Sequence, residues 1–168
     1  YYYFMAPFLL LINYNPVGPG VMVALFVVAT VCLIYYITSR FFNKRVAVFA
    51  CALYAVSPLV VAYSRSSWNP NPLPFFSLLT LITVFEAVRR KSLKLFFASG
   101  ILLGIAMQLH YLALFLSSVM FFYILFTSLF KNLNKASLIS LFKKYLMLFV
   151  GFLIGWSPFL AFEFRHGF

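Results

Sequence analysis

The chain has 168 residues, of which 65% are hydrophobic and only 9% charged, and 13 Lys and Arg against 2 acids give a net charge of +11. A soluble domain carries charge on about a quarter of its residues, so this composition excludes a soluble protein. So high an apolar content also excludes a disordered chain. The two acids are Glu86 and Glu163, and Asp is absent. The chain opens Tyr1-Tyr2-Tyr3, with its first Met at position 5, which indicates a piece of a longer protein.

Apolar segments that approach the length of a membrane span recur along the chain. Residues 1–11 indicate the end of an earlier helix or an interfacial helix, and longer apolar segments follow at 21–38, 46–63, 73–88, 95–109, 111–130 and 145–162. Most approach the ~20 residues that a helix needs to cross the hydrocarbon. The sequence therefore predicts an all-α, polytopic transmembrane helix bundle of about six full spans plus a partial N-terminal helix. Residues 1–168 are expected to form a single region.

The basic residues lie mostly between alternate spans. All but two of the 13 Lys and Arg fall in three groups, at 40–45, 89–94 and 131–144, whereas Arg65 and Arg165 lie in the other connections. By the positive-inside rule the three groups are cytoplasmic and Arg65 and Arg165 lie outside. A nucleic-acid-binding protein would instead collect its charge on one solvated domain, so no nucleic-acid partner is expected.

The apolar run 95–130 is interpreted as two crossings. Both loops that flank it are basic and belong on the cytoplasmic side, so the run must cross the membrane twice. Its only polar interruption, at 108–111, predicts a tight outer turn. Gly100 and Gly104, spaced four residues apart, indicate a helix face for close packing before this turn.

Polar side chains concentrate in the predicted outer connections. One connection carries the guanidinium of Arg65, the indole of Trp68 and the amides of Asn69 and Asn71. The planar fork of an Arg suits a phosphate, although lipid headgroups account for it equally well. Asn71 is able to cap the following helix, and Trp68 to anchor at the interface. His110 is either a polar turn residue or, when protonated, a donor to an anionic ligand.

The two carboxylates have local explanations. Glu86 lies three and four residues before Arg89 and Arg90 and is interpreted as their partner on the same helix. Glu163 is the only outer acid and is able to pair with Arg165. No metal-ligand spacing, phosphate-binding glycine loop, Ser/His/Asp set or carboxylate pair occurs in the sequence, so no metal site is predicted.

From the residues alone, Arg65, His110 and Arg165 form a candidate cradle for an anionic lipid or a phosphate-bearing substrate. A transporter, a lipid-handling enzyme and a structural subunit all remain open at this point. A scaffold subunit predicts no role for Arg65 or His110.

Several short motifs carry a resemblance to a known family. They are Tyr1-Tyr2-Tyr3, Ser57-Pro58, Tyr63-Ser64-Arg65, Trp68-Asn69-Pro70-Asn71 leading to Phe75-Phe76, the run from Gly100 to Tyr111, and the run from Phe162 to Phe168. In this order the chain resembles, over essentially its whole length, the bacterial GT-C membrane glycosyltransferases of the protein-mannosyltransferase, aminoarabinose-transferase and RgtA/B/C/D-like group.

The resemblance implies an enzyme that moves a sugar from a polyprenyl-phosphate carrier to a lipid, glycan or protein acceptor. Arg65 and His110 correspond to positions that help form the carrier-phosphate site, and His110 stands where Lys is commoner. Asn69 or Asn71 stands where many relatives have an Asp, and an amide serves neither as a base nor as a strong metal ligand. The carrier-phosphate or substrate-binding residues expected on this basis are Arg65, Asn69, Asn71, His110, Tyr111 and Arg165.

The resemblance also implies that the catalytic Asp lies upstream of residue 1, in the first outer loop. The segment is therefore expected to be truncated at both ends and to lack the catalytic base, for which Glu163 is a weak substitute. No cofactor is predicted, and a divalent metal has no support in the sequence. The expected location is the bacterial inner membrane, in contact with membrane lipids, with the site on the outer face. A non-enzymatic transporter or flippase of a phosphate-bearing lipid is the alternative.

Overall fold

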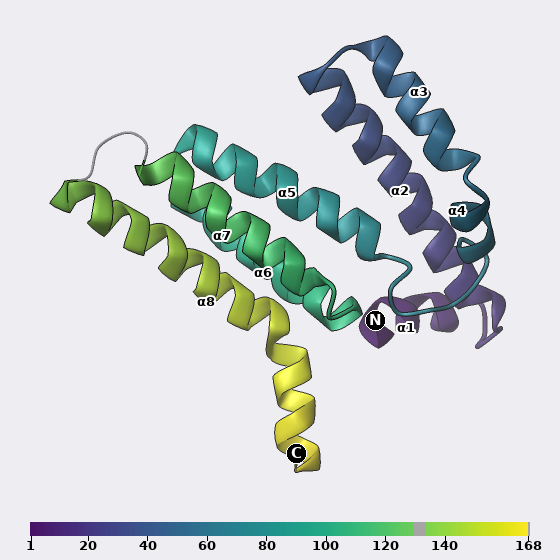
Figure 1. Ribbon diagram of the computed structural model, residues 1–168. Helices are drawn as coiled ribbons and strands as arrows, with labels where there is room; N and C mark the ends of the chain where they lie inside the picture. Colours follow the sequence, from purple (N-terminus) through teal and green to yellow (C-terminus); the bar gives the residue numbers. More distant parts are fainter. Residues whose placement is uncertain (130–133, 168) are drawn as a thin grey trace. The chain divides into compact units, whose positions relative to one another are not determined.

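A computed structural model describes residues 1–129 and 134–167. In this part of the chain the regular structure consists of eight helices and no strand (Figure 1). They are α1 (Tyr2–Leu11), α2 (Val17–Phe41), α3 (Lys44–Ala55), α4 (Pro58–Tyr63), α5 (Leu73–Arg90), α6 (Leu93–Leu109), α7 (Ala113–Leu129) and α8 (Lys135–His166). The predicted all-α class is confirmed. The chain forms two compact units, Tyr1–Leu78 and Leu79–Phe168, and each is described by itself.

The first unit is organised around the long helix α2. The thiol of Cys51 in α3 donates to the backbone carbonyl of Val31 in α2 at 3.4 Å, which ties the two helices together. Aromatic rings join the other elements to α2: the ring of Phe4 in α1 lies 5.7 Å from that of Phe26 in α2 and 5.4 Å from that of Phe76 in the first turn of α5. Offset and edge-on ring pairs of this kind stabilise packing beyond the area that they bury.

The predicted span at 46–63 is divided into two helices. α3 has 12 residues and α4 only 6, and the chain leaves the helical conformation at Ser57, whose φ is −59° and ψ is 122°. Ser57 precedes Pro58, and the ring of a proline disfavours the helical conformation in the residue before it. Neither helix alone is long enough to cross a bilayer.

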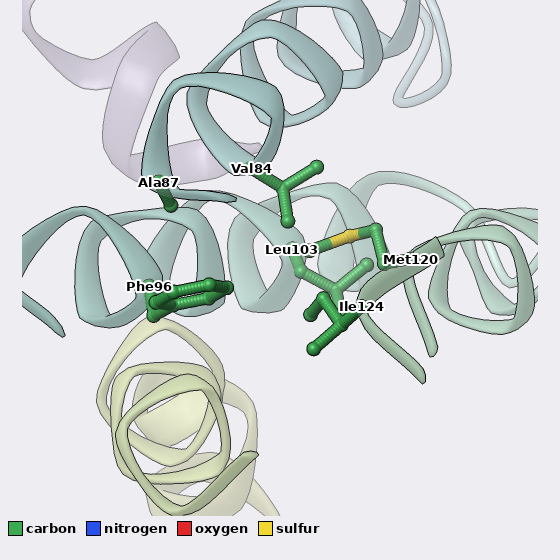
Figure 2. Close-up of a cluster of buried hydrophobic side chains, with 6 residues drawn as sticks. All are labelled: Val84, Ala87, Phe96, Leu103, Met120 and Ile124. Carbon is green, nitrogen blue, oxygen red and sulfur yellow. The ribbon is translucent and has the colours of Figure 1, made fainter. Parts of the chain in front are cut away.

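The second unit holds a buried apolar cluster between three helices. Figure 2 shows its six side chains, which come in pairs from α5, α6 and α7: Val84, Ala87, Phe96, Leu103, Met120 and Ile124. α5 and α6 are joined by a short connection. The turn predicted at 108–111 is found at residues 110–112, between α6 and α7, and Gln108 lies within α6.

α6 and α8 run parallel and approach each other closely through glycines on both helices. A Cβ atom added at Gly104 would lie 2.6 Å from the backbone oxygen of Phe152, and one added at Gly151 or Gly155 would meet backbone oxygens of α6. Gly100 is equally enclosed by backbone atoms of α8. The packing face predicted from Gly100 and Gly104 is confirmed.

α8 bends in its C-terminal part, where Pro158 lies inside the helix (Figure 1). Proline has no N–H, so the carbonyl of Ile154 loses its helical donor. The hydroxyl of Ser157 donates to this carbonyl at 2.7 Å. The side-chain amide of Gln108 in α6 donates to the next carbonyl, that of Gly155, at 2.5 Å. The backbone polar groups at the bend are therefore satisfied, as an apolar environment requires.

Two helices are long and apolar enough to cross a membrane, α2 with 25 residues and α8 with 32. α1, α6 and α7 are shorter apolar helices. The 17 residues of α6 span about 25 Å, against about 30 Å of hydrocarbon. The prediction of about six full spans is therefore not confirmed.

Candidate functional site

Arg65 borders an open hollow of about 500 Å³ in the first unit. The connection after α4 lines one side of it with Ser64, Arg65 and Ser67, and the first turns of α2 line the other. Arg65 is exposed, and in the described part of the chain no hydrogen bond or ion pair engages its guanidinium. Its planar set of N–H donors is thus available to a phosphate or carboxylate.

The N-terminal end of α2 also borders this hollow. The positive end of the helix dipole favours an anion there. The first N–H groups are already engaged, since Val17 donates to the side chain of Asn15 at 3.0 Å and Gly18 donates to its carbonyl at 3.0 Å. Pro19, the next residue, has no N–H. Direct hydrogen bonds to an anion would therefore come from Arg65. The dipole of α2 would add a favourable electrostatic field at the same place.

Asn71 holds the loop that carries Arg65. Its side-chain Nδ2 donates to the backbone carbonyl of Tyr63 at 2.9 Å and to that of Ser66 at 2.7 Å, and these two residues lie on either side of Arg65 along the chain. The interpretation of Asn71 as the cap of the following helix is wrong, because its amide turns back to this loop and α5 begins at Leu73. The amide of Asn71 therefore holds the backbone on both sides of Arg65.

A smaller hollow of about 180 Å³ lies beside the same connection, and Asn71 lines it together with Tyr63 and Trp68. The rings of Tyr63 and Trp68 lie 5.6 Å apart with an interplanar angle of 33°. Apolar walls with a few polar groups are typical of small-molecule sites. Asn69 is exposed on the same connection and makes no hydrogen bond within the described residues.

His110 forms the turn between α6 and α7 in the second unit. Its Nδ1 accepts the N–H of Leu112 at 3.2 Å, and its ring stacks on Tyr111 with the centroids 4.4 Å apart. An imidazole that accepts through Nδ1 carries its proton on Nε2. In this arrangement the Nε2 edge of His110 is the one left for a ligand, and Tyr111 is largely exposed.

Arg165 lies in the last turn of α8, also in the second unit. The predicted pairing of Glu163 with Arg165 is not seen, since no ion pair joins them in residues 134–167. α8 continues about 15 Å beyond Gly155, the residue that Gln108 contacts. Within the described residues no hydrogen bond or ion pair joins Arg165 to the His110 turn.

The structure thus groups five of the six predicted site residues in two sets and leaves Arg165 by itself at the end of α8. Arg65, Asn69 and Asn71 share one connection of the first unit, and His110 and Tyr111 share one turn of the second. Sequence reasoning missed the second glycine pair, Gly151 and Gly155, although its spacing of four repeats that of Gly100 and Gly104. It also missed the contact of Gln108 with α8, for which the sequence carries no signal.

Glu86 behaves as predicted. Its Oε2 accepts from Nη2 of Arg89 at 2.6 Å and from Nε of Arg90 at 2.7 Å, both on the same helix. Within the described residues no group of three His, Cys, Asp or Glu side chains is placed to hold a metal ion.

The all-helical fold and its apolar helices define a helical integral membrane protein, with an arginine available at one of its polar connections. The family model described as dolichyl-phosphate-mannose-protein mannosyltransferase matches residues 1–162. The chain belongs to this family, a family of membrane glycosyltransferases of the GT-C type. No curated protein and no solved structure matches the chain.

Proposed function

We propose that the chain contributes the carrier-phosphate site of a glycosyltransferase that uses a polyprenyl-phosphate-linked sugar on the outer face of the membrane, in the inner membrane of a bacterium. The acceptor is a lipid, a glycan or a protein. The observation that carries the proposal is the exposed side chain of Arg65, which borders the hollow at the start of α2 on a loop whose backbone Asn71 holds. Family membership supports the glycosyl transfer.

In such a reaction the acceptor oxygen attacks the anomeric carbon, and the bond from that carbon to the carrier phosphate breaks. The phosphate departs with increased negative charge, which a fixed cation stabilises more in the transition state than in the ground state. We assign this role to Arg65. His110, Arg165, Asn69 and Tyr111 are further candidate contacts of the carrier or the acceptor.

The reaction also needs a carboxylate to accept the proton of the acceptor. The chain has no Asp, and Glu86 is engaged by Arg89 and Arg90. We therefore place the base outside residues 1–168, with Glu163 as the weaker choice.

The proposal is tested by sugar transfer from a polyprenyl-phosphate donor, using the full protein in proteoliposomes. Arg65→Ala is expected to lower kcat by about 100-fold or more, the usual effect of removing one donor to a developing oxyanion. Arg65→Lys keeps the charge but not the planar fork, and is expected to fall between Arg65→Ala and the wild type. Arg45→Ala, which removes an exposed cation of α3, is the matched control and should leave transfer unchanged. Transfer that is insensitive to Arg65→Ala, or movement of the donor lipid across the bilayer without sugar transfer, would refute the proposal.

A shared role of Arg65 and His110 is tested separately by a double-mutant cycle. Two side chains that contact one phosphate should show a coupling energy above about 0.5 kcal/mol in kcat/KM, whereas independent sites should give additive losses. Additive losses would assign the carrier phosphate to Arg65 alone.

A further inference from the structure

A second polar hollow, of about 600 Å³, lies in the second unit, at the end of α6 opposite His110. Its lining comes from the C-terminal ends of α5 and α7 and from the N-terminal ends of α6 and α8. Its apolar lining includes Val88, Leu93 and Phe96. Its polar lining includes hydroxyl groups of α7 and α8 and three lysines, Lys91, Lys143 and Lys144. The hollow therefore combines apolar and cationic lining.

The positive charge of this hollow is not balanced by the chain. Glu86 and Glu163 are the only acids of the sequence. Glu86 is bound by Arg89 and Arg90, and Glu163 lies near the C-terminal end of α8, whereas the hollow lies at its N-terminal end. The ammonium group of Lys144 donates to the Ser128 hydroxyl at 2.8 Å. Those of Lys91 and Lys143 form no hydrogen bond or ion pair within the described residues. The hollow thus offers at least two cationic donors to an external anion.

The backbone at Lys91 supports a role for its side chain. α5 ends in a Schellman motif, in which the N–H of Lys91 donates to the carbonyl of Val88 at 3.3 Å and that of Ser92 to Ala87 at 3.1 Å. Lys91 takes the left-handed conformation that this motif requires, with φ at +51°. Glycine is the usual residue there because a Cβ atom is disfavoured. A lysine in this position is unfavourable for the backbone, and its side chain lines the hollow.

We propose that this hollow binds the phosphate group of an anionic membrane lipid, with Lys91 and Lys143 as its main contacts. Ammonium groups and hydroxyls suit the several oxygens of a phosphate, and the apolar side chains of Val88, Leu93 and Phe96 that line the hollow suit an attached apolar chain. α6 separates this hollow from His110 by about 25 Å, so the hollow does not include the His110 turn. It lies among the basic groups that the positive-inside rule assigns to the cytoplasmic leaflet.

The test measures lipid binding to the full protein, purified in a neutral detergent, by native mass spectrometry. The probes are phosphatidylglycerol, zwitterionic phosphatidylcholine of the same acyl chains, and inorganic phosphate. The variants are Lys91→Gly, Lys143→Gln, and Lys94→Gln as the matched control, since Lys94 is an exposed lysine of the same end of α6 that does not line the hollow. Lys144 is left intact because it is bonded to Ser128.

We expect the wild type to retain phosphatidylglycerol in preference to phosphatidylcholine. Lys91→Gly and Lys143→Gln should each weaken this binding by about fivefold or more, and Lys94→Gln by less than twofold. Lys91→Gly should melt at or above the temperature of the wild type, because glycine suits its backbone, so its loss of binding would not reflect unfolding.

Binding of phosphatidylglycerol that inorganic phosphate does not displace would support the lipid headgroup as the ligand. Displacement by millimolar phosphate would overturn the lipid and assign the hollow to a soluble anion. Equal losses in Lys94→Gln and Lys91→Gly would overturn the site in favour of general attraction to the bilayer charge. In detergent without anionic lipid, Lys91→Gly should transfer sugar at the wild-type rate. A loss of lipid binding in this variant would therefore test the lipid site alone and not the carrier-phosphate proposal.

Discussion

The close contact of α6 and α8 predicts a large effect for one added methyl group. In Gly104→Ala the new Cβ atom would lie 2.6 Å from the carbonyl oxygen of Phe152 and 2.8 Å from the backbone nitrogen of Trp156. Ordinary contacts of a Cβ atom begin at 3.4 Å, and backbone atoms have no rotamer by which to move aside. The two helices must therefore separate by roughly 0.5–1 Å, a gap that forfeits a quarter to a half of the dispersion energy of each contact across it.

The magnitude follows from two opposing terms. Alanine is a better helix former than glycine by about 1 kcal/mol, whereas overpacking at a rigid contact costs about 1–3 kcal/mol. Because the three nearest atoms to the methyl group are backbone atoms of α8, the cost lies near the upper end, and Gly104→Ala should lower the free energy of unfolding by about 2 kcal/mol. In a membrane, where apolar lipid competes with apolar packing, close van der Waals contact is a main source of helix association.

The assay is denaturant or thermal unfolding of the full protein in detergent, and Gly20→Ala in α2 is the matched control. An added Cβ at Gly20 would meet its nearest atom, the carbonyl oxygen of Arg65, at 3.9 Å. Gly20→Ala should therefore stabilise the protein by about 0.5–1 kcal/mol. If Gly104→Ala were as stable as Gly20→Ala, the glycine contact between α6 and α8 would not exist as described.

Two further predictions concern polar contacts. Gln108→Leu removes the donor to the Gly155 carbonyl at the bend of α8 and should lower the free energy of unfolding by about 1–2 kcal/mol. The same unfolding assay measures this change, and an unchanged stability would contradict the role given to this hydrogen bond. Asn71→Asp replaces an amide donor by a carboxylate that faces the carbonyls of Tyr63 and Ser66, so it should lower sugar transfer as strongly as Arg65→Ala, while Asn71→Ala should have a smaller effect. Wild-type transfer by Asn71→Asp would show that this side chain does not position Arg65.

Local features of the sequence predict several parts of the fold correctly. Apolar runs predict the helices, and the polar interruption at 108–111 predicts the break between α6 and α7 to within two residues, although Gln108 itself belongs to α6. The pairing of Glu86 with Arg89 and Arg90 follows from helical spacing alone. The division of 46–63 into two helices has a local signal too, because a proline disfavours the helical conformation in the residue before it, here Ser57. The apolar character of the whole run instead favours a single span, and the structure shows that the proline decides.

The sequence by itself determined the apolar, all-helical character of the protein, the face of Gly100 and Gly104, and the presence of Arg65 in a polar connection. These depend on composition and on residues within one or two helical turns of each other. Only the tertiary structure decided that Arg65 borders the start of α2, that Asn71 turns back to hold its loop, and that Lys91 and Lys143 line one hollow. Such contacts join residues far apart in the chain, and which helix faces meet depends on packing across the whole unit, for which hydropathy and spacing carry no information.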